Sequence, residues 1–173
     1  MKYITYVLAI LLVFTGCKQT PKLDEILSLE DETDIILGIG ELLWEKSKND
    51  KNFESLNQFE KNVLYIEMLE GQVNNGGFDQ YFFNSSGEYA HETLVALNDI
   101  GANNTVDIFE QAIKIFPKFP IPKDMEERRE YMRNLPKNIS EVWYQLEDKF
   151  YEYPDAIGQL TIKYIKKNRA QFE

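Results

Sequence analysis

The chain has 173 residues, of which 19 are basic and 29 acidic, so its formal net charge at pH 7 is −10. This charge disfavours nucleic acids and anionic lipid headgroups as partners and favours basic protein surfaces, although it would also simply keep a protein soluble. A single cysteine excludes an internal disulfide, and a single histidine excludes any site that needs two.

The N-terminus has the pattern of a secretory signal peptide over residues 1–16. Lys2 supplies a positive charge, the eleven residues 4–14 carry none, and small residues precede Cys17. Eleven residues rise only about 16 Å as a helix, whereas the hydrocarbon core of a bilayer is about 30 Å thick. The alternative, a buried N-terminal helix, would show polar positions at a period near 3.6, and residues 4–14 show none. We therefore expect a signal that is too short to span a membrane and is removed.

Cys17 follows a motif that sharpens this expectation. Phe14-Thr15-Gly16-Cys17 resembles the lipobox of bacterial lipoproteins, in which the cysteine sulfur receives a diacylglycerol and a peptidase cuts before the cysteine. The small Gly16 suits that peptidase, whereas Phe14 departs from the usual Leu or Val. The resemblance implies lipidation of Cys17 and attachment to the extracytoplasmic side of a membrane in the bacterial cell envelope. A free thiol is the alternative.

After Cys17 we expect a short tether and then one domain. Residues 17–32 are mostly polar, contain Pro21 and end in an acidic run, with room for one helical turn around residues 23–29. The domain is expected over residues 33–173, a normal size for a single domain.

Within the domain, apolar residues recur at intervals of three and four, which predicts helices throughout. The predicted helices run, in chain order, over about residues 33–45, 55–71, 88–100, 104–116, 124–135, 140–150 and 155–165. Expected N-caps include Thr33 or Asp34, Asn104 or Thr105, and Asp155. No segment alternates as a strand would, so the predicted fold class is all-α, a single compact domain of roughly six to eight helices.

Residues 72–84 differ from the rest because they gather amides, glycines and aromatic residues between two predicted helices. Glycine adopts left-handed backbone angles easily, which favours a sharp turn there. A buried amide left unpaired costs about 1–3 kcal/mol, so these amides must bond to backbone, to one another or to a ligand. Two alternatives stay open: a structural turn, or the site of a small-ligand-binding protein or hydrolase. The candidate residues are Glu70, Gln72, Asn74, Asn75, Gly76, Gly77, Phe78, Gln80 and Asn84.

The same stretch carries a family resemblance. The pattern Glu70-x-Gln72-Val73-Asn74-Asn75-Gly76-Gly77-Phe78-x-Gln80-Tyr81-Phe82-x-Asn84-Ser85-x-Gly87 resembles the signature of a bacterial helical domain family of otherwise unknown function. Its best-known relatives are the DNA-mimic proteins, and the likeness extends over most of the chain after Cys17. The resemblance implies an all-helical fold and, in the mimic members, binding of a DNA-binding protein through carboxylates placed like phosphates.

Two acidic clusters are candidates for a partner-binding face. Duplex DNA presents one charge per about 1.7 Å of axis, so mimicry requires a dense face. An extracytoplasmic lipoprotein would not meet DNA-binding regulators, so we expect another protein partner with a basic surface, such as the toxin of an immunity-type inhibitor. Solvated helix faces are the plain alternative. The clusters are Glu30, Asp31, Glu32 and Asp34, and Glu147, Asp148, Glu152 and Asp155.

The sequence contains no phosphate-binding loop, nucleophile elbow, zinc-binding helix or calcium loop. We therefore predict no catalytic residue, no metal, no cofactor and no nucleic-acid partner, while enzymatic activity stays open. Glu67 and Glu70, one helical turn apart, could serve acid–base chemistry, but such spacing is frequent by chance in acidic helices. His91 is expected to be a surface or capping residue.

Overall fold

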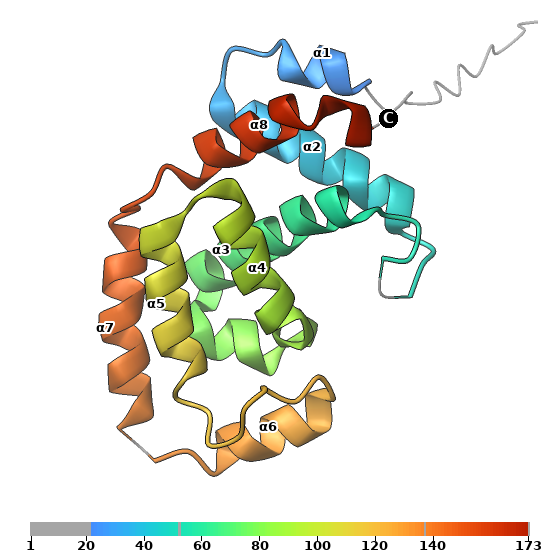
Figure 1. Cartoon of the computed structure of the whole chain (residues 1–173). Helices are drawn as coiled ribbons and strands as arrows, with labels where there is room; N and C mark the ends of the chain where they lie inside the picture. The colour runs from blue at the N-terminus through green and yellow to red at the C-terminus, as the bar shows by residue number, and fades with distance from the viewer. Residues whose placement is uncertain (1–21, 52, 137, 173) are drawn as a thin grey trace, which may run out of the picture.

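The computed structural model describes residues 22–51, 53–136 and 138–172 (Figure 1). The expected signal peptide, Cys17 and the first part of the tether lie outside the described residues. Within the described residues there are eight α-helices and no strand, which confirms the predicted all-α fold. None of these helices is long and apolar enough to span a bilayer. The elements are α1 (Leu23–Leu27), α2 (Glu32–Ser47), α3 (Gln58–Phe83), the 3-10 helix η1 (Ser85–Tyr89), α4 (Ala90–Ile100), α5 (Asn103–Ile113), α6 (Met125–Arg133), α7 (Ile139–Tyr151), α8 (Ile157–Lys167) and the 3-10 helix η2 (Arg169–Gln171).

The longest helix, α3, connects two hydrophobic clusters. Its second half packs with α4, α5 and α7 around a core that contains several aromatic residues, among which Phe78, Tyr81 and Phe82 have no exposed surface. Phe82 lies within 6.0 Å, ring centre to ring centre, of Phe109 and Trp143. Aromatic pairs at these spacings add about 0.5–1.5 kcal/mol each beyond burial. This cluster fixes the second half of α3, which carries the amide-rich segment.

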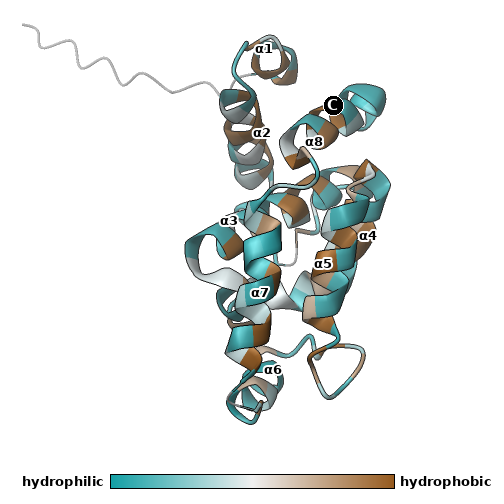
Figure 2. Cartoon of the chain, turned by 90° about the vertical axis from the view of Figure 1, so that its left-hand side faces the viewer, coloured by the Kyte–Doolittle hydropathy of each residue, from teal (hydrophilic) through white to brown (hydrophobic). Residues whose placement is uncertain are grey.

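The first half of α3 packs with α1, α2 and α8 in the second cluster. Leu23 and Ile26 of α1 are buried there, so packed structure begins ahead of the expected domain start at Thr33. Figure 2 shows that the helices carry apolar and polar bands side by side, in agreement with the amphipathic periodicity of the sequence.

The predicted end of a helix at Gly71 is wrong. α3 continues through Gly71 to Phe83, with a kink where Gly76 and Gly77 leave helical geometry. A glycine inside a helix costs about 1 kcal/mol relative to alanine. Burial of Leu69 and Val73, both with no exposed surface, outweighs that cost.

Several predicted N-caps also differ. α2 is capped by Asp31, whose carboxylate accepts hydrogen bonds from the amides of Thr33 and Asp34, in place of either of those residues. α8 receives no side-chain cap from Asp155. The carboxylate of Asp155 binds the first turn of α5 instead, because the chain folds back between α7 and α8 and brings it there. Sequence spacing shows where a cap is available but not which helix it will cap.

Candidate functional site: the kink of α3 and the surface of α7

The kink of α3 depends on glycine at position 77. Gly77 has φ +72° and ψ −173°, a combination that residues with a Cβ rarely adopt. A Cβ added there would lie 2.3 Å from Oε1 of Glu147, far inside van der Waals contact. Glycine is therefore required both for the backbone angle and for the close approach of α7.

Glu147 of α7 closes the kink. Its Oε1 accepts a hydrogen bond from the backbone amide of Phe78 at 2.7 Å, and the residue is only 5% exposed. Burial raises the pKa of the Glu147 carboxyl, and the hydrogen bond from Phe78 partly opposes that rise. The carboxylate thus caps the second half of α3 from a different helix.

The amides around the kink bond to one another. Oε1 of Gln72 accepts hydrogen bonds from Nε2 of Gln80 at 3.1 Å and from Nδ2 of Asn84 at 2.8 Å. Nδ2 of Asn75 donates to Oε1 of Gln80 at 2.9 Å. Asn74 lies apart and donates to the hydroxyl of Tyr153 at 2.7 Å. The fold therefore brings four of the five amides of this segment into one network, and each of the four makes at least one hydrogen bond within it.

This geometry favours the structural alternative for residues 72–84. The hollows described below are lined by other segments, and every amide of the network already has a protein partner. Glu70 does not join the network. Its side chain borders a small hollow together with Glu67 and Thr161, between α3 and α8.

Glu67 and Glu70 form a half-buried carboxyl pair there. Burial raises the pKa of Glu67 to about 7. Burial also raises the pKa of Glu70 to about 7, with additional contributions from the charges of Glu67 and Glu32. Within the described ranges, no three His, Cys, Asp or Glu side chains are grouped so that they could hold a metal ion. The raised pKa values of Glu67 and Glu70 favour proton uptake by this pair.

Arg128 is a structural residue that sequence reasoning missed. It has no exposed surface, and its Nε donates to the carbonyl oxygen of Phe82 at 2.6 Å. One terminal nitrogen donates to the carbonyl of Asn84 at 2.7 Å, and the other to those of Pro122 and Lys123 at 2.9 and 3.0 Å. One guanidinium thus caps the end of α3 and holds the proline-rich crossing. An arginine in a highly charged helix gives no sequence signal of burial.

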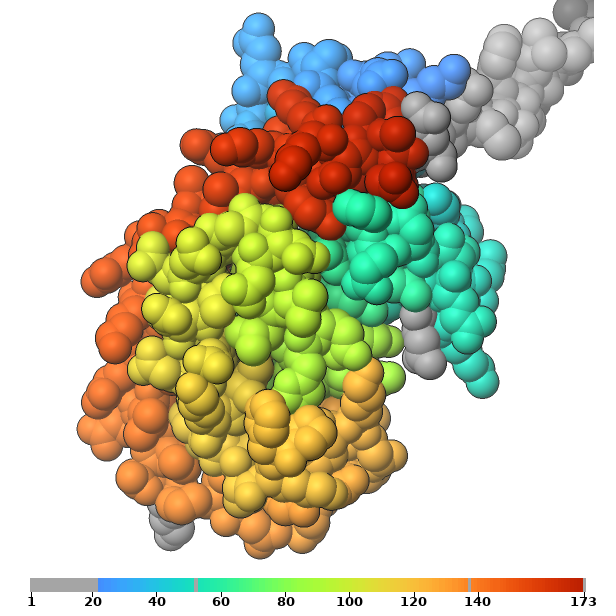
Figure 3. All heavy atoms as spheres, in the orientation of Figure 1, coloured from blue at the N-terminus to red at the C-terminus, as the bar shows by residue number. Residues whose placement is uncertain are grey.

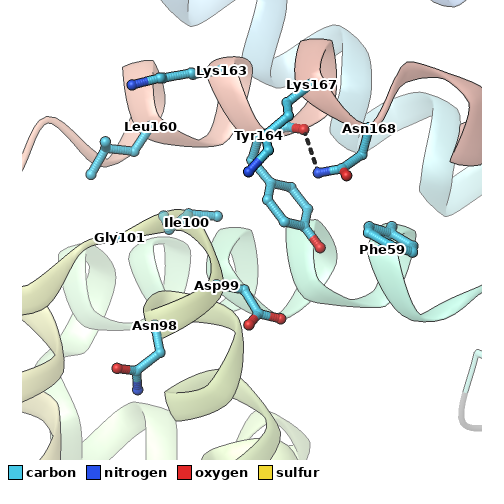
Figure 4. Close-up of a pocket in the computed structure, with 10 residues that line it drawn as sticks. All are labelled: Phe59, Asn98, Asp99, Ile100, Gly101, Leu160, Lys163, Tyr164, Lys167 and Asn168. Carbon is cyan, nitrogen blue, oxygen red and sulfur yellow. Dashed lines mark hydrogen bonds between the residues drawn. The ribbon is translucent and has the colours of Figure 1, made fainter.

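A second feature of the surface is an open cleft of about 420 Å³ between α4 and α8 (Figure 4). Lys163 and Lys167 lie on its α8 side and Asp99 on its α4 side. Asn62 of α3 connects two lining residues of the cleft, because its Nδ2 donates to Asp99 at 2.7 Å and to the hydroxyl of Tyr164 at 3.1 Å. These lining groups offer polar contacts but no nucleophile paired with a base.

Comparison with known protein families identifies the family to which this chain belongs. The model of a family described as DMP19-like protein matches residues 54–168, which include α3 to α8 and more than half of the chain. The chain belongs to the DMP19-like protein family. No curated protein and no solved structure matches it.

The family match confirms the resemblance inferred from the amide-rich segment. The DMP19-like region contains the kink of α3, its amide network and all of α7, so it is a helical domain of the DNA-mimic-like kind. α1 and α2 precede the matched residues and pack against α3 and α8.

On the DMP19-like domain, the predicted acidic cluster of α7 is divided by the fold. Asp148 and Glu152 are exposed. Glu147 is buried at the kink, and Asp155 accepts hydrogen bonds from the amide of Thr105 at 2.8 Å and from Nδ2 of Asn104 at 2.9 Å. Glu147 and Asp155 are therefore structural and do not belong to an exposed acidic face.

The fold adds Glu141 to the two exposed carboxylates. Positions 141, 148 and 152 follow one stripe of α7, because seven and eleven residues are close to whole numbers of helical turns. We call Glu141, Asp148 and Glu152 the acidic ridge; it extends over about 16 Å. Sequence spacing could have identified Glu141, but its charge alone did not distinguish it from other exposed acids.

The other predicted cluster is also exposed but has basic neighbours. Asp31 caps α2, so part of its charge is used locally. Glu30 and Glu32 border a surface hollow whose opposite side is formed by Lys163 and Lys166 of α8. These lysines reduce the local negative potential, which leaves the acidic ridge as the better candidate for a basic partner.

Proposed function

We propose that this protein is an envelope lipoprotein, anchored through acylated Cys17, whose DMP19-like domain binds a protein with a basic surface. A DNA-mimic-like family implies a protein partner. The acidic ridge is the observation that carries the proposal, because it offers three exposed carboxylates on one stripe of a rigidly packed helix. Charged surfaces of this kind steer association with an oppositely charged partner.

The density of charge distinguishes this function from DNA mimicry. About 16 Å of duplex DNA carries roughly ten phosphate charges, because one charge occurs per about 1.7 Å of axis. The ridge supplies three carboxylates over that length. It therefore suits recognition of a few basic side chains, as in an immunity-type inhibitor that neutralises a toxin at the envelope.

A two-part experiment tests this proposal. Mass spectrometry of the native protein should show a chain that begins at Cys17 and carries acyl groups. Purification from envelope fractions at low salt should recover a protein partner that dissociates as the salt concentration rises, since exposed charge pairs are screened.

Variants of the ridge provide the matched comparison. Asp148→Asn combined with Glu152→Gln should reduce recovery of the partner several-fold. Glu126→Gln combined with Glu130→Gln should not, because these two acids already pair with arginines of their own helix. Failure to recover any salt-sensitive partner would refute the binding role of the ridge.

A cytoplasmic DNA mimic that sequesters a DNA-binding protein is the second candidate, and the family match favours it. An intact Met1 together with an unmodified thiol at Cys17 would remove the anchor and put this alternative first. Competition between duplex DNA and the recovered partner would then be the decisive measurement.

A further inference from the structure

Three lysines of α8 form a basic stripe on this acidic protein, with Glu30 and Glu32 across the hollow from Lys163 and Lys166. Lys163, Lys166 and Lys167 are exposed and lie three and four residues apart, so they share one side of the helix. In the part of the chain that the structure describes, no ion pair joins any of them to a carboxylate. We call these three residues the lysine face.

The lysine face lies at the end of the molecule from which the tether leaves. Nε and one terminal nitrogen of Arg169, just after α8, contact the carboxylate of Asp24 in α1 at 3.0 and 2.9 Å. This ion pair holds the C-terminal end of α8 beside the first turn of α1. Figures 1 and 3 show α8 lying across this end of the molecule next to α1, with α6 at the opposite end.

Chain length then limits how far the lysine face can be from an anchored Cys17. Five residues separate Cys17 from Leu23, the first residue of α1. Whatever their conformation, this stretch spans at most roughly 20 Å. A bilayer that holds the acyl chains of Cys17 is therefore within reach of the end of the domain formed by α1 and α8.

We propose that the lysine face binds anionic lipid headgroups and orients the anchored domain on the membrane. This inference rests on the proposed anchor at Cys17. The net charge of the protein argues against anionic lipids, but screening limits the field of each charge to about 8 Å at physiological salt. The local sign of the surface nearest the headgroups therefore decides the interaction.

Contacts of the lysine face with anionic lipids would be strong enough to orient the domain, and this orientation leaves the acidic ridge accessible. Each lysine close to an anionic surface strengthens association by about 1 kcal/mol, or roughly five-fold. Anchoring at the end formed by α1 and α8 leaves the α6 end distal to the membrane, and α7 lies along the flank of that distal half (Figure 1). The acidic ridge is then accessible to a soluble partner.

Lysine footprinting of the lipidated full-length protein tests this inference. The protein is reconstituted into vesicles of phosphatidylcholine alone, or of equal parts phosphatidylcholine and phosphatidylglycerol. Flotation with the vesicles is measured first, and a water-soluble amine-labelling reagent with mass spectrometry then reports the accessibility of each lysine. Lys163, Lys166 and Lys167 should be labelled several-fold more slowly in the anionic vesicles, and high salt should remove the difference.

Two other exposed lysines serve as internal controls: Lys114, at the C-terminal end of α5, and Lys149 of α7. Their labelling should be the same in both kinds of vesicle. The triple variant Lys163→Gln, Lys166→Gln, Lys167→Gln should float normally with both kinds of vesicle, because the acyl chains on Cys17 hold the protein on the bilayer and the lysines only orient it. Equal labelling of the lysine face in both vesicles, with normal flotation, would overturn the orientation and leave the anchor intact. Failure to float with either vesicle would refute the anchor, and this inference with it.

Discussion

The carboxylate of Glu147 and the backbone amide of Phe78 are joined by a hydrogen bond of 2.7 Å across 69 residues of sequence. This bond connects α7 to the kink of α3 and converts an acidic residue from a candidate partner contact into part of the core. Because it links the helix that carries the acidic ridge to the centre of the fold, it also fixes the position of the ridge.

Removal of the Glu147 carboxylate should destabilise the domain without a specific effect on partner recognition. Glu147→Ala leaves the buried amide of Phe78 without its acceptor, which should cost about 1–3 kcal/mol of unfolding free energy. Glu147→Gln keeps an acceptor oxygen and should cost clearly less. Urea unfolding of both variants gives the comparison, and equal stability of the two would show that the hydrogen bond contributes little.

Substitution of Gly77 should be far more harmful than the same substitution at Gly71. Gly77→Ala combines a positive φ with a clash against Glu147, and should destabilise by about 2 kcal/mol or more. Gly71→Ala introduces a methyl group that meets no atom within 4 Å, in the middle of a helix. It should stabilise by about 0.5–1 kcal/mol, as measured by thermal unfolding. Opposite signs for the two alanines are expected, and a stabilising Gly77→Ala would contradict the kink.

Arg128 should not be replaceable by lysine. Arg128→Lys retains the charge but cannot supply the four hydrogen bonds that the guanidinium donates to backbone carbonyls. Several buried acceptors lose their donor, so we expect a loss of about 3 kcal/mol. Arg133→Lys is the control, because Arg133 makes an exposed ion pair with Glu130 and should change stability by less than about 0.5 kcal/mol. Similar melting temperatures for both variants would be the contrary outcome.

The stability of the domain should decrease as the pH rises through about 7. The folded-state pKa values of Glu67 and Glu70 are about 7, above the ordinary value of 4.5. The folded state therefore binds protons more tightly than the unfolded state at these positions. Their stabilising contribution is complete below the ordinary pKa and is lost as the pH rises through the folded-state pKa.

Urea unfolding at about pH 5 and about pH 8 measures this dependence. The double variant Glu67→Gln, Glu70→Gln should flatten it, whereas Glu41→Gln, a change at an exposed carboxylate of α2, should leave it in place. A wild-type domain that becomes more stable between these two pH values would show that protonation of Glu67 and Glu70 does not stabilise the fold.

Local sequence patterns were sufficient to predict the class of fold and most helices. The three- and four-residue spacing of apolar residues predicts helices directly, and the helix expected from residue 124 is α6, with Asp124 as its N-cap. The glycines at 76 and 77 likewise predicted a change of direction at the correct place. The family signature lies in the same segment, which is why the resemblance agreed with the comparison.

Tertiary structure alone decided which polar residues are structural and which are exposed. Glu147 and Asp148 are neighbours in the sequence, yet one is buried at the kink and the other is exposed on the acidic ridge. Asp155 caps α5 rather than α8. The carboxylates of Glu147 and Asp155 each accept a hydrogen bond from a backbone amide, and these amides come from segments 69 and 50 residues away in the sequence. The sequence therefore determined where helices form, whereas tertiary packing determined whether each charged side chain is hydrogen-bonded within the fold or exposed to solvent.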